Sequence, residues 1–254
     1  HYLKLDPWFR QFHHKDLTFS LMYAFSENFV LPISHDEVVY MKGSLRGKMP
    51  GGEWQQLAGV RAFMVYMLTH PGKKLTFMGA ELGQWHEWDF AGQLDWYLLE
   101  NEINRKTQDF FRALNRYYLE NPALWRVDFD WAGFEWLVAD DNQDNTVVFV
   151  RRDGAGEELL VAVNFSPNGY RDYRFGVPPR KTWREELSTD DTAFGGTGAW
   201  RNEKTVKTQD FPSHGREQSA AITIPPLGAV ILRGEGEYKK PKAKKSKARE
   251  DKQA

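Results

Sequence analysis

Cysteine is absent from the 254 residues, so the chain contains neither a disulfide nor a thiolate that could act as a metal ligand or nucleophile. The sequence also has no apolar run near the roughly 20 residues that a membrane-spanning helix needs. Its first residues show neither the charged leader nor the apolar core of a signal peptide. We therefore expect a cytoplasmic protein in a reducing compartment, with no membrane partner.

Several sequence patterns of cofactor and metal sites are missing as well. The chain has no glycine-rich phosphate loop, no His-Glu-x-x-His pattern and no serine-centred nucleophile elbow. The scattered histidines at 13, 14, 70, 86 and 214 do not have the spacing of metal ligands. We expect no cofactor and no metal.

Charge is nearly balanced overall but unevenly placed. Residues 239–254 carry eight Lys or Arg against Glu250 and Asp251, a charge of +6, and the net charge of −1 therefore leaves −7 for the rest. This segment lacks the apolar residues that would offset chain entropy, so we predict a disordered basic tail over residues 234–254. Such a tail could bind nucleic acid, but a solvated extension is the commoner outcome, and we expect no nucleic-acid partner.

What the chain has in quantity is aromatic side chains, which make up 15% of it and include ten Trp.

In the first half of the chain, short apolar runs alternate with helical patterns. An apolar run, Phe29–Ile33, precedes a polar loop and a helical pattern over residues 53–70; a second run over residues 75–78 precedes a Trp-rich loop and a helical pattern over residues 106–119. This order predicts buried parallel strands with helical crossovers, and chemistry in the loops after the strands.

After Trp125 the hydrophobic period becomes two, which predicts an antiparallel β-sandwich over residues 126–233. Residues 1–125 hold too few strands to close a barrel, which takes about eight, so we expect this α/β part to be incomplete. The expected strands are the runs 135–138, 147–150, 159–163, 173–177, 183–187 and 220–232.

His35, Asp36 and Glu37 follow the first expected strand directly. Cleaving a glycosidic bond with retention needs a carboxylate nucleophile, a carboxyl acid/base and groups that bond the ring hydroxyls as positive charge develops. Asp36 could fill any of these roles. On spacing alone, a turn or helix cap formed by Ser34 or Asp36 is the commoner outcome.

Longer segments resemble a known family. From residue 29 the chain reads FVLPISHDEVVYMKGSLRGKMPG, HPGKKLTFMGAELGQWHEW and GQLDWYLL, and later GFEWLVADD, VVFVRRD, VNFSPNGYRDYRFGVP, WREELSTD and SHGREQSAAITIPPLGAVIL. In order and spacing these segments resemble the C-terminal part of bacterial 1,4-α-glucan (glycogen) branching enzymes, of the α-amylase-type superfamily, over roughly residues 1–233. The resemblance implies an enzyme of glycogen biosynthesis, a glycosyltransferase, whose α/β part is the C-terminal portion of a (β/α)8 barrel.

The resemblance also implies roles for particular residues. His35 and Asp36 match the family's last catalytic segment, in which both bind sugar hydroxyls and the Asp stabilises the transition state; Glu37 adjoins them as a substrate-binding candidate. The nucleophilic Asp and the acid/base Glu lie in earlier segments of the family, so this chain is expected to need an N-terminal catalytic portion and to be inactive alone. Trp85 and Trp88 are candidates for stacking on an acceptor sugar, with core packing as the equal alternative.

The implied reaction cuts an α-1,4 bond, holds the glucan on the Asp and passes it to a 6-hydroxyl, so that α-glucan (glycogen or amylose) is the expected partner. Where the family usually has His-Gly-Lys and Met-Gly-Asn-Glu-Phe, this chain has Tyr40-Met41-Lys42 and residues 78–82 read MGAEL, which bears on subsite preference. The alternatives are an α-glucan hydrolase or debranching enzyme of the same superfamily, and a non-catalytic glucan-binding module.

Overall fold

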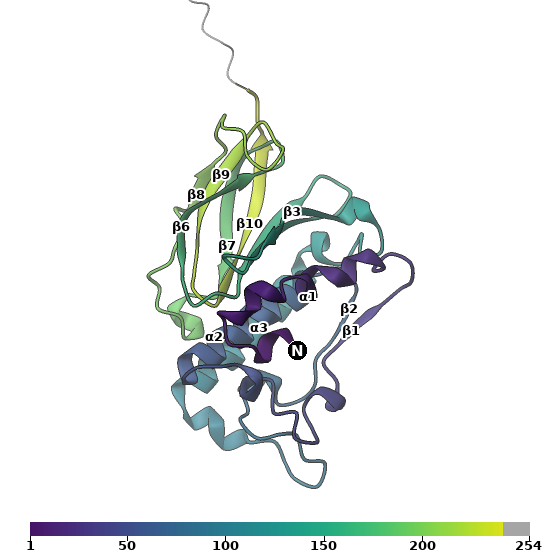
Figure 1. The fold of residues 1–254 in the computed structure, drawn as a ribbon, viewed down its shortest axis with the longest axis vertical. Helices are drawn as coiled ribbons and strands as arrows, with labels where there is room; N and C mark the ends of the chain where they lie inside the picture. Colours follow the sequence, from purple (N-terminus) through teal and green to yellow (C-terminus); the bar gives the residue numbers. More distant parts are fainter. Residues whose placement is uncertain (241–254) are drawn as a thin grey trace, which may run out of the picture.

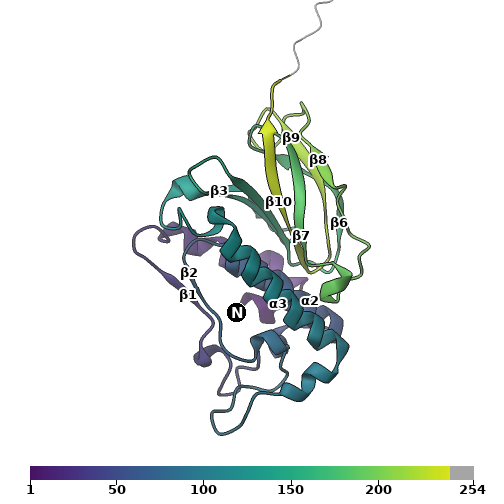
Figure 2. The ribbon, with the colours of Figure 1, turned by 180° about the vertical axis from the view of Figure 1, so that it is seen from behind.

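The computed structural model describes residues 1–240, which form a helical part and a β-sandwich (Figure 1). The helical part contains α1 (Lys15–Thr18), α2 (Glu53–Thr69) and α3 (Glu102–Glu120), together with two short strands, β1 (Val30–Pro32) and β2 (Lys73–Leu75). Figure 2 shows α3 running across the helical part below the large sheet. Within the described residues, no helix combines the length and apolarity that crossing a membrane requires.

The strands β1 and β2 are parallel and are joined through α2, as the alternating pattern predicts. The expected burial of both strands is wrong: Val30 is 53% exposed and Leu75 is 47% exposed. The second strand also begins earlier than expected, at Lys73 instead of Leu75. The physical reason for the exposure is that, within residues 1–240, each strand has one hydrogen-bonded neighbour, the other. A two-stranded sheet cannot cover both of its faces and edges.

The helix α2 is buried on nearly all sides, and its predicted bounds are confirmed to within one residue. Its expected core face is inside, with Leu57, Val60 and Met64 at most 1% exposed. The helix contacts both α3 and the large sheet, through β5 and β10. Because the helix is contacted from two sides, its Gly, Ala and polar positions are buried in addition to its hydrophobic face.

The sandwich consists of a six-stranded antiparallel sheet, in the order β3-β4-β5-β10-β7-β8, and a two-stranded sheet, β6-β9. This confirms the predicted antiparallel all-β part. The expected single run over residues 220–232 is wrong, because Pro225 and Pro226 lack the N–H groups that a ladder needs and separate two strands. The strands are β3 (Phe134–Asp141), β4 (Thr146–Arg152), β5 (Glu158–Asn164), β6 (Tyr170–Gly176), β7 (Arg180–Ser188), β8 (Thr205–Lys207), β9 (Ser219–Ile224) and β10 (Gly228–Glu237).

Both faces of the large sheet are covered. On β5, Leu159 and Val161 point into a core shared with α2 and α3, whereas Leu160 and Ala162 point into a core between the two sheets. A strand that is buried on both faces has no polar alternation. This arrangement explains the continuous apolar run of β5 and fixes the sandwich on the helical part.

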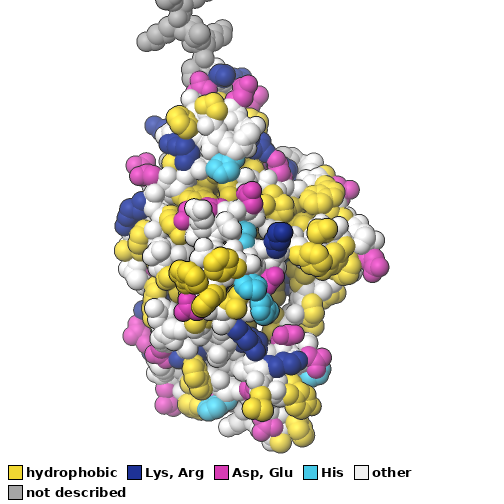
Figure 3. All heavy atoms as spheres, viewed as in Figure 1, with side chains coloured by type: hydrophobic (Ala, Val, Ile, Leu, Met, Phe, Trp, Pro, Cys, Tyr) yellow, Lys and Arg dark blue, Asp and Glu magenta, His cyan; other side chains and the backbone are white. Residues whose placement is uncertain are grey.

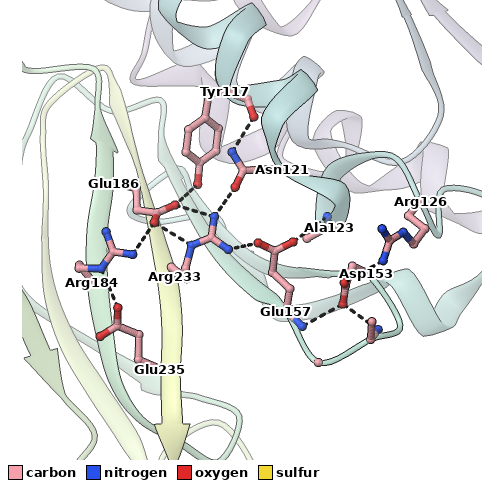
Figure 4. A network of polar contacts seen from close by, with 12 residues as sticks. Tyr117, Asn121, Ala123, Arg126, Asp153, Glu157, Arg184, Glu186, Arg233 and Glu235 are labelled. Carbon is pink, nitrogen blue, oxygen red and sulfur yellow. Dashed lines mark hydrogen bonds and ion pairs between the residues drawn. The ribbon is translucent and has the colours of Figure 1, made fainter.

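A polar network also joins the two parts, at the end of α3 (Figure 4). Arg233 on β10 donates to Glu186 on β7 at 2.7 and 3.0 Å and also contacts Asn121 and Glu157. The hydroxyl of Tyr117 on α3 donates to Glu186 at 2.7 Å. Each of these carboxylates is partly buried and meets a compensating donor, as buried charges require.

The strand β10 continues to Glu237, so the predicted boundary of the basic tail at residue 234 is wrong. Residues 234–237 pair with β7, where Gly234 lies opposite Trp183 and Glu237 opposite Arg180. Residues 241–254 lie outside the described residues, and the disorder expected for them stays a prediction.

Candidate active site

His35, Asp36 and Glu37 form a single 3₁₀ turn immediately after β1. The buried Ile33 anchors this turn, because its N–H donates to the Leu75 carbonyl of β2 at 2.8 Å. The three polar side chains therefore stand at the carboxyl end of the parallel pair, where α/β proteins place their chemistry. They are exposed, with relative side-chain accessibilities of 54% for His35 and 67% for Asp36.

Aromatic rings flank this turn. The Nε2 atom of His35 lies 3.2 Å from Oδ1 of Asp36, and the His35 ring centre lies 6.1 Å from Phe77 and 6.4 Å from Trp88. Phe77 and Trp88 themselves meet edge to face at 5.0 Å, and the backbone N–H of Trp88 donates to the Val38 carbonyl at 3.0 Å. The structure thus brings Trp88 to the predicted pair and leaves it half-buried.

Sequence reasoning missed Phe77 as a neighbour of His35. The available signal was its position near the end of the second apolar run, since the carboxyl ends of adjacent parallel strands meet at one edge of a sheet.

The loop after the turn is held by two charged side chains. The Nζ atom of Lys48 donates to the carbonyls of Lys42 and Gly43 at 2.8 Å each and also to that of Glu37. Burial lowers the pKa of Lys48. The Glu87 carboxylate accepts the N–H of Gly43 at 2.6 Å and that of Met41 at 3.1 Å, and these two hydrogen bonds lower the pKa of Glu87.

Tyr40 and Met41 occupy this loop with φ of 56° and 66°, in the left-handed region that favours glycine. Both side chains are almost fully exposed, at 84% and 97%. A side chain in this region of backbone space is strained, and neither side chain gains packing that would offset the strain.

The remaining predicted residue, Trp85, is half-exposed and lies over the Arg46 guanidinium at 5.2 Å. Arg46 is buried and pairs with Glu53 at 2.8 Å, so Trp85 covers an ion pair at the start of α2. Two acids in the same region have local partners: Glu81 accepts the Gly79 N–H at 3.1 Å, and Asp95 lies 2.9 Å from His86. Both acids thus have partners within their own loop.

A cavity of about 720 Å³ opens beside the turn and is lined mainly by apolar side chains. Glu37 and Lys48 line it from the site, and Ile33 and Val38 line it from just before and just after the turn. Tyr2 and Leu17 close it from the N-terminal segment. Beside this cavity, His35 offers a hydrogen-bond donor, Asp36 offers an acceptor, and Phe77 and Trp88 form a flat aromatic wall. These groups suit a ligand that carries hydroxyl groups and apolar ring faces.

Within residues 1–240, metal-donor atoms come within reach of one another at His1, His13 and Asp16. These side chains are exposed or half-buried, and the group lies on the N-terminal segment outside the His35 turn.

Comparison with known proteins places this geometry in context. Residues 136–235 match the family described as alpha amylase, C-terminal all-beta domain. The chain is 49% identical over 231 residues to a 1,4-alpha-glucan branching enzyme of Aromatoleum aromaticum, which covers 91% of this chain and 36% of that protein. It is 48% identical over 235 residues to the enzyme of the same name from Cupriavidus necator, covering 92% and 31%.

A third relative of the same name, from Pseudomonas aeruginosa, is 49% identical over 236 residues, covering 92% of this chain and 32% of that protein. Among solved structures, an alpha-amylase from Geobacillus thermoleovorans complexed with acarbose aligns with 72% of this chain and 34% of that chain, at 18% identity and a TM-score of 0.46, too low to support an argument. The chain spans about a third of the length of the curated relatives it matches. The resemblance stated from the sequence is confirmed.

Proposed function

We propose that this chain, which matches the C-terminal part of bacterial 1,4-α-glucan branching enzymes, completes the catalytic site of such an enzyme. In the whole protein, an α-1,4 bond of a glucan would be cut and the released chain passed to a 6-hydroxyl, forming an α-1,6 branch. The observation that carries the proposal is the exposed His35–Asp36 pair at the carboxyl end of β1, within a sequence 49% identical to a named branching enzyme.

The proposed chemistry assigns a separate role to each group. The His35 ring donates a hydrogen bond to a sugar hydroxyl, and the Asp36 carboxylate binds hydroxyls and stabilises the positive charge that develops on the sugar ring. Glu37 contributes to substrate binding. The nucleophilic Asp and the acid/base Glu come from a polypeptide portion that precedes this one in the relatives, so the chain by itself lacks a complete catalytic set.

The exposure of β1 and β2 supports the proposal that residues 1–125 belong to a (β/α)8 barrel. Val30 and Leu75 are apolar strand residues with about half of their surface in water, an unusual state for a parallel sheet. Further parallel strands beside β1 and β2 would cover them and would satisfy the open strand edges. Residues 126–233 form the accompanying β-sandwich domain in this proposal.

Transfer, as opposed to hydrolysis, requires that an acceptor sugar outcompete water. Holding the acceptor in an oriented position contributes several kcal/mol to the preference for transfer, because bulk water is not oriented. Trp88 lies beside His35 and is half-buried, which suits it to form one wall of this subsite. Trp85 lies further along the same loop on Arg46, where it could contact a longer glucan chain.

The test is a reconstitution. This chain, supplied with the N-terminal portion of a matched relative in cis, is incubated with amylose, and new α-1,6 linkages are counted by debranching and chain-length analysis. We expect branching, and a loss of at least a hundredfold in kcat for Asp36→Asn. Asp109→Asn, an equally simple change at an exposed carboxylate of α3, is the control and should leave the rate unchanged.

Three outcomes would contradict the proposal. New reducing ends without new α-1,6 linkages would indicate a hydrolase of the same superfamily. Undiminished branching by the Asp36→Asn protein would remove the role of Asp36. Branching by the 254-residue chain alone would show that the missing carboxylates are not needed.

A further inference from the structure

A second concave surface lies where the N-terminal segment meets the sandwich. It is a cavity of about 390 Å³, which we call the Trp8 groove. Three parts of the chain line it: residues 6–11, residues 50–55 at the start of α2, and the sandwich turns that contain Asn145 and Asn168. Figure 3 shows hydrophobic side chains gathered in groups on the molecular face that carries the N-terminal segment in Figure 1.

The groove combines a flat ring with amide groups. Trp8 is 62% exposed, and its backbone N–H is fixed by the Asp6 carboxylate at 2.9 Å. Its ring is supported edge to face by Phe9 at 4.9 Å and by Phe12 at 5.5 Å. The amide side chains around it are those of Gln11, Gln55, Gln143, Asn145 and Asn168.

Asn145 is the one buried amide of these five. Its side chain is 5% exposed, and its Oδ1 atom is buried without a hydrogen-bond partner among the described residues. The side chain is held in place, because its Nδ2 donates to the Pro7 carbonyl at 3.2 Å. Because Oδ1 is itself buried, Asn145 positions the Pro7 backbone beside Trp8 and leaves contact with a ligand to the exposed amides of the groove.

The lining determines the class of ligand. Asp6 is its one ionisable side chain, and Lys and Arg are absent from it, so an anionic ligand such as a nucleic acid or phosphate has no countercharge there. An exposed indole binds the apolar face of a pyranose, and amide groups bond ring hydroxyls. We propose that the Trp8 groove binds a neutral α-glucan chain at a second site, separate from the His35–Asp36 pair. That the ligand is an α-glucan rests on the proposed function, whereas the inference that the groove binds a sugar rests on its lining residues.

The experiment measures binding of maltoheptaose to the 254-residue chain by calorimetry and by tryptophan fluorescence. Trp8→Ala should weaken the affinity by about tenfold, equivalent to about 1.4 kcal/mol. Gln143→Ala, an exposed position in the same groove, should weaken it about threefold without affecting Phe9 and Phe12. Trp131→Ala is the matched control: Trp131 is 56% exposed but lines a different pocket, and its loss should leave the affinity unchanged.

The outcomes separate this site from the proposed function. Asp36→Asn should leave maltoheptaose binding in the groove intact, whatever its effect on branching. The inference is overturned if the wild-type chain does not bind maltoheptaose, or if it binds equally well with Ala at position 8. Fluorescence quenching by decaproline but not by maltoheptaose would also overturn it, by identifying the groove as a peptide site.

Discussion

Replacing Arg151 with Met should lower the free energy of unfolding by about 3–5 kcal/mol. The Arg151 side chain is fully buried on β4 and ends among four acceptors. It donates to the Thr69 carbonyl at the end of α2 at 2.6 Å, to the Leu124 carbonyl at 3.2 Å and to the Gly133 carbonyl at 3.1 Å. It also pairs with Asp128 at 2.9 Å. Methionine fills the space but leaves a buried carboxylate and three carbonyls without this donor.

The neighbouring residue provides the matched control. Arg152 on the same strand pairs with Glu135 at 2.5 Å and with Glu158 at 2.8 Å, but its side chain is 24% exposed and water can replace it. Glu158 also keeps a second partner, Arg180, at 2.5 Å. Arg152→Met should therefore cost only about 1 kcal/mol.

The assay is urea unfolding followed by circular dichroism and tryptophan fluorescence, with the m-values compared between variants. The difference between the two arginines is what the reasoning predicts, because the two substitutions are chemically identical and differ in burial. Equal losses, or a loss below about 1 kcal/mol for Arg151→Met, would show that the buried guanidinium is not what joins α2 to the sandwich.

Three further outcomes are expected. Burial lowers the pKa of His70 to about 3, below its unfolded value of about 6.5, so the unfolded chain binds more protons than the folded chain between these pH values. The free energy of unfolding should therefore fall on acidification below pH 6.5, by up to about 1.4 kcal/mol per pH unit. In urea titrations at a series of pH values, the free energy of unfolding should depend less steeply on pH for His70→Asn. Met41→Gly should raise the free energy of unfolding by up to about 1 kcal/mol by relieving the left-handed backbone at φ 66°, measured by urea unfolding. Tyr117→Phe should lower the thermal midpoint and cost about 1.5 kcal/mol, since it removes the 2.7 Å hydrogen bond to Glu186; no change would mean that the other donors to Glu186 suffice.

The elements that could be predicted are those whose signal is local and repeated. The helix α2 carries Leu57, Val60 and Met64 at helical spacing and ends just before Pro71-Gly72, and its predicted bounds differ from the observed ones by one residue. Residues 159–163 of β5 are all apolar because both faces of the sheet are covered there, and this run predicts the strand. The position of His35 and Asp36 after β1 followed from the same reasoning about strand ends.

The features that could not be predicted depend on contacts far apart in the sequence. The exposure of Val30 and Leu75 is decided by which strands lie beside them, which their own residues do not encode. The contact of His35 with Phe77 joins two strand ends 42 positions apart. Asn145 looks like an ordinary turn residue in the sequence, and only its burial against Pro7 shows that one of its oxygens lacks a partner.

Arg10 offers a test of whether the sandwich shapes the Trp8 groove. Arg10 is 2% exposed, and its guanidinium donates to the Phe165 carbonyl after β5 at 2.6 Å and to the Leu3 carbonyl at 3.2 Å. These hydrogen bonds hold the N-terminal segment against the sandwich two residues beyond Trp8. Arg10→Met leaves the buried carbonyls unpartnered, and we expect a loss of stability of about 2–3 kcal/mol together with weaker maltoheptaose binding. The His35–Asp36 pair is positioned by the hydrogen bond from Ile33 to β2 and not by Arg10. Branching of short malto-oligosaccharides by the reconstituted enzyme should therefore persist at temperatures where the Arg10→Met variant is folded. Loss of stability with unchanged maltoheptaose affinity would show that the position of Trp8 does not depend on the sandwich.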